Sequence, residues 1–71
     1  MTWARFGDVI IPLSSVSIMR IQTAPDSKWC VEVSFYQGTY LSSVQTPAFA
    51  TKPEAERVAE RIAHGTYWEG V

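Results

Sequence analysis

The two residue types that support thiol-based nucleophilic catalysis occur once each in this chain, as Cys30 and His64. One cysteine and one histidine from distant parts of a chain are what such a site uses. Their surroundings favour a structural role instead. Cys30 lies mid-strand beside Trp29 and Val31, and His64 falls in the last turn of a predicted helix, where a cation suits the helix dipole. We therefore predict that the protein is not an enzyme.

Acid–base, metal and phosphate chemistry each lack the spacing that they require. Glu56 and Glu60 lie one helical turn apart, but they share the polar arc with Arg57, Arg61 and His64, which is typical of a solvated face. One cysteine with one histidine does not complete a four-ligand zinc site. The four glycines are isolated and form no phosphate-binding loop. We expect neither a metal nor a cofactor.

A helical stripe is the clearest structural signal, and it covers residues 51–65. One side of this stripe is apolar and the other is charged. The apolar side holds Ala55, Val58, Ala59, Ile62 and Ala63, and the polar side holds Glu54, Glu56, Arg57, Glu60, Arg61 and His64. Thr51 and Glu54 fit a capping box, and Gly65 is a helix stop. This pattern predicts one amphipathic helix.

Short strands are predicted ahead of the helix. Residues 3–6 and 9–13 flank Gly7-Asp8, which we interpret as a tight turn. Residues 16–23 are rich in strand formers, but their mixed pattern requires either a bulge near Arg20 or burial of both faces. Residues 24–27 contain Pro25 and Asp26 and predict a turn. Residues 28–36 form the strongest strand, because Trp29, Val31, Val33 and Phe35 make one wholly apolar face.

The turn that follows this strand sets the predicted register of the last hairpin. With the loop centred on Gln37-Gly38, the expected opposite pairs are Phe35 with Tyr40, Val33 with Ser42, and Val31 with Val44. The sequence thus predicts a single α+β domain over residues 1–71. It consists of a small antiparallel meander of three to five strands followed by one helix on one sheet face. That covered face is expected to hold Trp29, Val31, Val33, Phe35, Tyr40 and Val44, and residues 66–71 form an aromatic tail.

The small size of the chain predicts that it self-associates. A domain of 71 residues buries about 60% of the surface that its unfolded chain exposes. Its core supplies a free energy of unfolding of about 3 to 5 kcal/mol unless a disulfide, a metal or self-association adds to it. The lone Cys30 excludes an internal disulfide, so association into a homodimer is the remaining source of additional stability. The composition is 46% hydrophobic and 18% charged, which is typical of a folded chain and not of a disordered linker.

The expected location is the cytoplasm of the producing or host cell. No segment approaches the roughly 18 apolar residues of a membrane-spanning helix, so we expect no membrane partner. The N-terminal residues lack the basic start of a secretory signal. They also lack its long apolar stretch, because the apolar residues 9–11 are followed directly by Pro12. The unpaired Cys30 agrees with a reducing compartment.

The surplus of aromatic residues predicts a binding surface. Three Trp and three Tyr are many for so small a core, and Trp, Tyr and Arg dominate the binding energy of protein interfaces. The candidate contact residues are Trp3, Tyr36, Tyr67 and Trp68, with Arg5 and Arg20 as polar anchors. A second interpretation keeps Trp29 and Tyr40 in the core while Trp3 and Trp68 only cover an open edge of the domain.

The predicted function is non-enzymatic binding of a partner protein, as a regulator or inhibitor that occupies the partner's surface. One hypothesis is that the chain is a phage protein directed at host machinery, because small regulators and inhibitors without chemistry include proteins of this kind. In element order alone, the chain resembles coactivator-type single-stranded-DNA binders and small pleckstrin-homology-like domains. The first resemblance implies base stacking on an aromatic sheet face. Against nucleic acid stands the net charge of −1, with dispersed basic residues. A structural subunit of a homo-oligomer is the third alternative.

Overall fold

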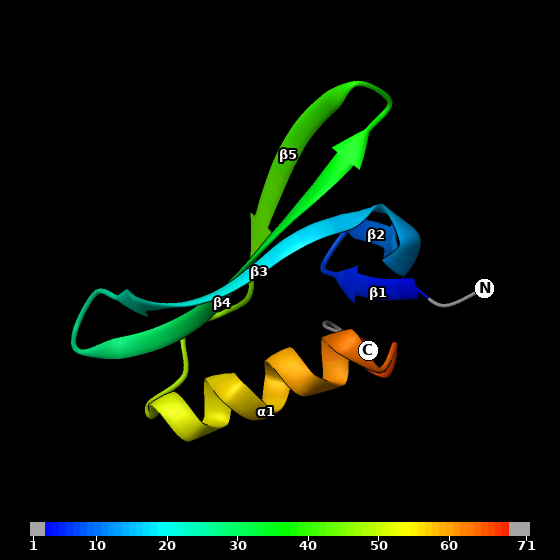
Figure 1. Ribbon diagram of the computed structural model, residues 1–71. Helices are drawn as coiled ribbons and strands as arrows, with labels where there is room; N and C mark the ends of the chain where they lie inside the picture. Colours follow the sequence, from blue (N-terminus) through cyan, green and yellow to red (C-terminus); the bar gives the residue numbers. More distant parts are fainter. Residues whose placement is uncertain (1–2, 69–71) are drawn as a thin grey trace.

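Two antiparallel sheets and a C-terminal helix make up residues 3–68, the part of the chain that the computed structural model describes (Figure 1). The elements in chain order are β1 (Trp3–Phe6), β2 (Val9–Pro12), the 3-10 helix η1 (Leu13–Ser15), β3 (Val16–Ala24), β4 (Lys28–Gln37), β5 (Tyr40–Gln45) and α1 (Lys52–Ala63). Strands β1 and β2 form one sheet, and the order β3-β4-β5 forms the other. The predicted α+β fold class, a strand meander followed by one helix, is confirmed.

The first hairpin forms as its turn residues predict. Phe6 lies opposite Val9, so Gly7 and Asp8 are the two-residue loop, and Gly7 adopts a φ of 62°. A positive φ at the first loop position is what a primed hairpin turn requires, and glycine adopts it without strain. The second strand ends at Pro12, and Leu13 already belongs to η1.

Strand β3 contains a bulge, but not where the sequence placed it. Val16 lies opposite Phe35 and Ile18 lies opposite Ser34, so the extra residue is Ser17 and not one near Arg20. The extra residue reverses the alternation, and this reversal is the physical reason for the mixed pattern. It brings Met19 and Ile21 onto the same sheet face as Val16, opposite Val33 and Val31 on β4.

The register of the last hairpin is two residues away from the predicted one. The loop is Gly38-Thr39, with Gln37 opposite Tyr40, and the pairs are Phe35 with Ser42 and Val33 with Val44. Gly38 has a φ of 62°, and this backbone requirement places it at the first loop position instead of the second. A shift of two residues preserves which side chains share a face.

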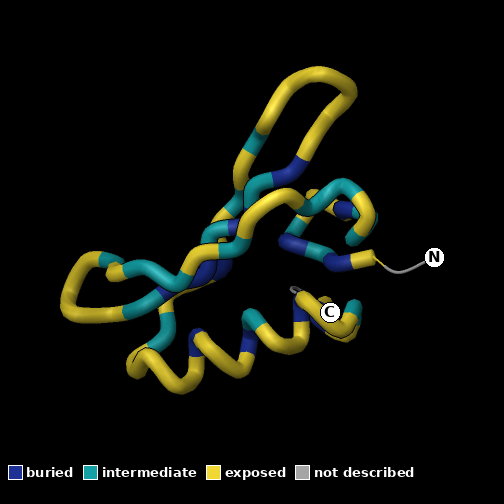
Figure 2. Tube along the Cα trace, viewed as in Figure 1, coloured by how far each residue is buried: buried dark blue, intermediate teal, exposed yellow. Residues whose placement is uncertain are grey.

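The same shift corrects the prediction for Tyr40. The shift puts Tyr40 directly beside the loop at the tip of the hairpin, where its side chain is 76% exposed and does not belong to the core. Val44 remains partly buried against the core. Figure 2 shows the tip of the β4-β5 hairpin as an exposed loop that projects away from the helix.

Helix α1 packs its apolar stripe across β4 and β3. Ala55, Val58 and Ile62 are buried, whereas Ala63, predicted on the apolar side, is exposed in the last turn. The Thr51 hydroxyl accepts a hydrogen bond from the Glu54 backbone N–H at 3.4 Å, which caps the first turn. At the other end, the Gly65 N–H donates to Ile62 and the Thr66 N–H donates to Arg61, which together form a Schellman motif.

The buried core lies between α1, the three-stranded sheet and the β1-β2 hairpin. It is formed by Ala4, Phe6, Ile11, Val31, Val33, Phe35, Ala55, Val58, Ile62 and Tyr67. Trp29 lies at the margin of this core, with the Lys52 ammonium 5.5 Å from its ring centroid. The core therefore includes a residue of the C-terminal tail, Tyr67, in addition to the helix and strands.

Thr46 extends the hydrogen bonding between β5 and β4 by one residue, through its backbone N–H and its hydroxyl. Its backbone N–H donates to the Val31 carbonyl at 3.0 Å, and its hydroxyl accepts from the Val31 N–H at 3.0 Å and donates to the Pro47 carbonyl at 3.1 Å. Thr46 is 6% exposed, so water does not readily replace this bond. The hydroxyl thus satisfies a buried strand N–H where the chain leaves β5 for α1.

Replacing Thr46 by Val is expected to destabilise the protein by about 1 to 3 kcal/mol, because the buried Val31 N–H loses its acceptor. Urea unfolding followed by circular dichroism measures this difference. Thr46→Ser is the matched control, since it keeps the hydroxyl and removes only a methyl group. Equal stability of the Val and Ser variants would mean that the hydroxyl does not support this part of the sheet.

Candidate protein-binding surfaces

Several large apolar and aromatic side chains remain exposed on the described residues: Trp3, Val9, Ile10, Ile18, Tyr36, Tyr40, Leu41 and Trp68. They fall on two separate parts of the fold. One group lies on the β1-β2 hairpin and the tail beside it, and the other lies on the three-stranded sheet and its projecting hairpin tip.

The first surface, called the tryptophan face below, consists of Trp3, Arg5, Ile10 and Trp68. Trp3 and Arg5 are two residues apart on β1 and so point to the same side. Arg5 lies opposite Ile10 on β2, and a parallel bridge pairs it with Trp68 on its other side. The Arg5 N–H donates to the Tyr67 carbonyl at 3.1 Å, which holds the tail against β1. Backbone pairing thus brings residues from both ends of the chain onto one face.

The apolar side chains of the tryptophan face are open to solvent in the single chain. Trp3 is 37% exposed, Ile10 is 52% exposed and Trp68 is 46% exposed. Arg5 is half-buried among them, and its Nε donates to the Gly7 carbonyl at 2.9 Å. This bond holds the stem of Arg5 along the face.

The opposite side of the same strands faces the core. Ala4, Phe6 and Ile11 are buried there, and the Phe6 and Tyr67 rings pack with centroids 5.3 Å apart. The Arg61 guanidinium lies 5.9 Å from the Tyr67 ring centroid. The strands and tail residues that carry the tryptophan face are therefore packed against the core on their other side.

The structure places Tyr67 differently from the expectation that it is a contact residue. Its side chain is 7% exposed and belongs to the core. The physical reason is alternation: Trp68 is on the outer face with Arg5, so its neighbour Tyr67 points inward to Phe6. Residues 66–68 of the predicted tail thus run beside β1, and residues 69–71 lie outside the described residues.

The second surface, called the hairpin arm below, is the distal part of β4-β5 from Phe35 to Ser42. Tyr36 lies opposite Leu41 on the side away from α1, and the two are 53% and 57% exposed. Tyr40 is the most exposed aromatic side chain among the described residues. Of the sequence candidates, only Tyr36 lies on this arm.

Arg20 lies apart from both surfaces. It is exposed on β3 opposite Glu32, on the sheet side away from α1, and it does not join Trp3, Arg5 and Trp68. Sequence reasoning missed Ile10 and Leu41 as surface residues. A signal for Leu41 was present, because the strand alternation already put it on the side opposite Tyr40 and Val44. Val9, Ile10 and Ile11 are all apolar, so alternation did not reveal which of them faces out.

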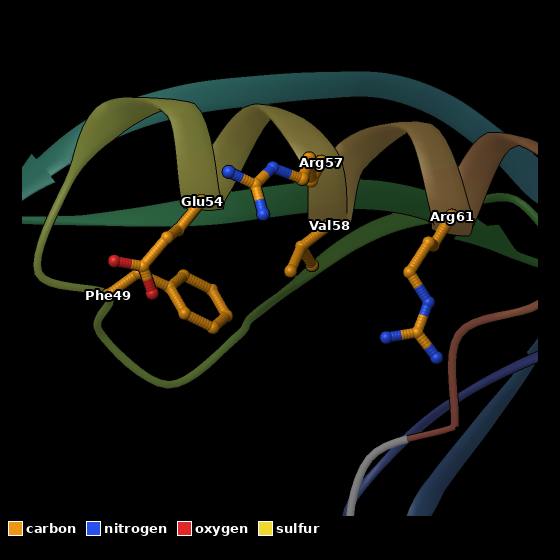
Figure 3. Close-up of a pocket in the computed structure, with 5 residues that line it drawn as sticks. All are labelled: Phe49, Glu54, Arg57, Val58 and Arg61. Carbon is orange, nitrogen blue, oxygen red and sulfur yellow. The ribbon is translucent and has the colours of Figure 1, made fainter.

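A shallow cavity of about 240 Å³ lies where α1 meets the connection from β5 (Figure 3). Phe49, Glu54, Arg57, Val58 and Arg61 line it. Two of its polar groups already have internal partners: a Glu54 carboxylate oxygen accepts from the Thr51 hydroxyl, and Arg61 donates to the Thr66 carbonyl. Its volume is below the roughly 300 to 1,000 Å³ of typical small-molecule sites. The cavity is therefore a weak candidate for a ligand site.

The residues considered for catalysis lie in different places. Cys30 is buried in β4 opposite Gln22, and its neighbour Val31 faces the helix side, so the thiol belongs to the other side of the sheet. His64 is the exposed C-cap of α1. Within residues 3–68, no three His, Cys, Asp or Glu side chains come together as a metal site would require. No helix in this described part has the length and apolar character to cross a membrane.

The fold and these two surfaces define the chain as a small α+β domain whose sheet residues carry exposed rings. No protein-family model, curated protein or solved structure matches it.

Proposed function

We propose that this protein is a non-enzymatic module that binds a partner protein through the tryptophan face and regulates or inhibits it by occupying its surface. The observation that carries the proposal is the gathering of Trp3, Ile10 and Trp68 around Arg5 on one exposed face. Trp and Arg are the residue types that contribute most binding energy when an interface buries them. We propose the cytoplasm of the producing or host cell as its location.

Rigidity supports the same proposal. The face is built on backbone pairs of β1, β2 and residues 67–68, and its reverse side is the packed layer of Phe6, Ile11 and Tyr67. Side chains that are already positioned before binding lose less conformational entropy when a partner arrives. The tryptophan face therefore supplies both aromatic area and preorganisation.

The charge of the face favours a protein partner over a nucleic acid. Arg5 is its one basic residue, and its Nε is already bonded to a carbonyl within the hairpin. Single-stranded nucleic-acid binders combine stacking rings with a basic groove that follows the phosphates. The tryptophan face has the rings, but the residues that compose it include no second cation.

The test is an affinity capture from lysate of the organism that encodes the chain, or of its host, with the partner then titrated in pure form. Trp68→Ala and Ile10→Thr are each expected to weaken binding by about 2 kcal/mol, or roughly 30-fold in Kd. Arg57→Ala, an exposed change on α1, is the control that keeps wild-type affinity.

Two results would overturn the proposal. Loss of binding with Tyr36→Ala but not with Trp68→Ala would move the site to the hairpin arm. Salt-sensitive binding of a labelled single-stranded oligonucleotide at low salt, weakened by Trp68→Ala, would assign the face to nucleic acid instead.

A further inference from the structure

Strand β5 is an edge strand without the features that usually protect such an edge. Natural sheets block free edges with charges, prolines or bulges, because unpaired N–H and C=O groups otherwise bind another strand. Among the described strands, β2 ends in Pro12, β3 has Arg20 and the bulge at Ser17, and β1 is flanked by Trp68. Strand β5 (Tyr40–Gln45) contains no proline, charge or bulge.

The absence of charge extends well beyond β5. Residues 33–51 contain no Asp, Glu, Lys, Arg or His. This segment includes the whole hairpin arm, which projects away from α1 (Figure 1), and β5 is the edge strand of its sheet. Two copies of the arm can therefore approach each other without like-charge repulsion, and Leu41, Tyr36 and Tyr40 offer apolar surface to cover.

The hydrogen-bond pattern of the hairpin identifies the groups that point to the free edge. In an antiparallel pair, opposite residues alternate between bonded and non-bonded positions, and the pair flanking a two-residue loop is bonded. Gln37 and Tyr40 flank the loop, so Leu41 and Ser43 occupy non-bonded positions toward β4. Their N–H and C=O groups therefore point outward, to where an added strand would lie.

A second copy meets this pattern in a definite register. In an antiparallel pair, residues that lie opposite each other have their side chains on the same sheet face. Because side chains alternate faces along each strand, the two-fold axis of two identical strands lies where one residue is opposite its own copy, and not between two residues. Centring on Ser42 places the outward groups of Leu41 in one copy opposite those of Ser43 in the other. It also places each Tyr40 opposite a Val44, an aromatic and β-branched pair that stabilises sheets. Centring on Ser43 would pair Leu41 with Gln45, and Tyr40 would no longer lie opposite Val44.

We propose that a second copy of this chain adds to β5 in antiparallel orientation, so that two three-stranded sheets join into one six-stranded sheet. The interface is formed by residues 40–44 of β5 and includes no residue of the tryptophan face. It therefore does not depend on the proposed function, and each proposal can fail while the other stands.

The test measures the dimer directly. Sedimentation velocity of the full chain across the micromolar range is expected to show reversible dimers. Ser43→Pro removes an outward N–H without removing a bond to β4, and Leu41→Lys adds a charge to the edge; each is expected to raise the dimer Kd roughly tenfold or more. Ile18→Lys, a similarly exposed apolar residue on β3, is the control that retains the dimer.

Hydrogen exchange of the Leu41 and Ser43 amides supplies a second measurement on the wild-type chain. Both amides are expected to become protected as the concentration rises through the dimer Kd. A chain that stays monomeric throughout this range overturns the proposal. So does a dimer that survives Leu41→Lys in a folded variant, or one in which these two amides exchange freely. A dimer lost with Ile18→Lys but not with Leu41→Lys would place the contact on β3.

Discussion

Replacing Ile62 by Ala is expected to leave the protein largely unfolded at room temperature. Ile62 is fully buried, and its side chain projects from α1 into the core. Removing this much buried hydrocarbon costs about 2 to 5 kcal/mol from lost transfer free energy and the cavity that remains. A core of this size supplies only about 3 to 5 kcal/mol in total. The loss is therefore comparable with the whole stability of the domain.

Far-UV circular dichroism and urea unfolding, at one fixed protein concentration, measure this effect. Ile62→Val is the control, and it is expected to cost about 0.5 to 1.5 kcal/mol because it removes a single methylene. If Ile62→Ala unfolded at the same urea concentration as the wild type, α1 would not be docked on the sheet through this residue.

Replacing Tyr67 by Ala is expected to cost about 3 to 5 kcal/mol, the range for removal of a large buried aromatic ring. The Tyr67 ring packs on Phe6, lies below the Arg61 guanidinium and joins the tail to the core. Its loss also weakens the position of Trp68, because the two residues share the backbone segment that pairs with Arg5.

The neighbouring residue provides the matched comparison. Trp68 is about half exposed on the outer face, so Trp68→Ala is expected to change the free energy of unfolding by no more than about 1 kcal/mol while it weakens partner binding. Thermal melts of both variants distinguish the two roles. A larger loss of stability for Trp68→Ala than for Tyr67→Ala would reverse the assignment of inner and outer faces.

The candidate site was only partly predictable from the residue types. Trp3, Arg5 and Trp68 were selected because Trp and Arg are frequent at interfaces, and the structure brings these three together. Arg20 fulfils the same compositional criterion but lies on a different sheet. Composition identifies which residues are suited to binding, whereas the pairing of distant strands determines which of them share a surface.

Elements that depend on neighbouring residues could be predicted from the amino-acid pattern. Helix α1, its Thr51 cap and the Gly7-Asp8 turn each depend on residues a few positions apart, and each formed as predicted, although Ala63 at the end of the apolar stripe is exposed. The Gly38 turn shows the limit, since a one-residue uncertainty in the loop centre moved the register by two. The burial of Tyr67 and the exposure of Trp68 could not be predicted in this way. Burial depends on contacts between residues far apart in the sequence, such as that between Phe6 and Tyr67. A pattern of neighbouring residues does not predict such contacts.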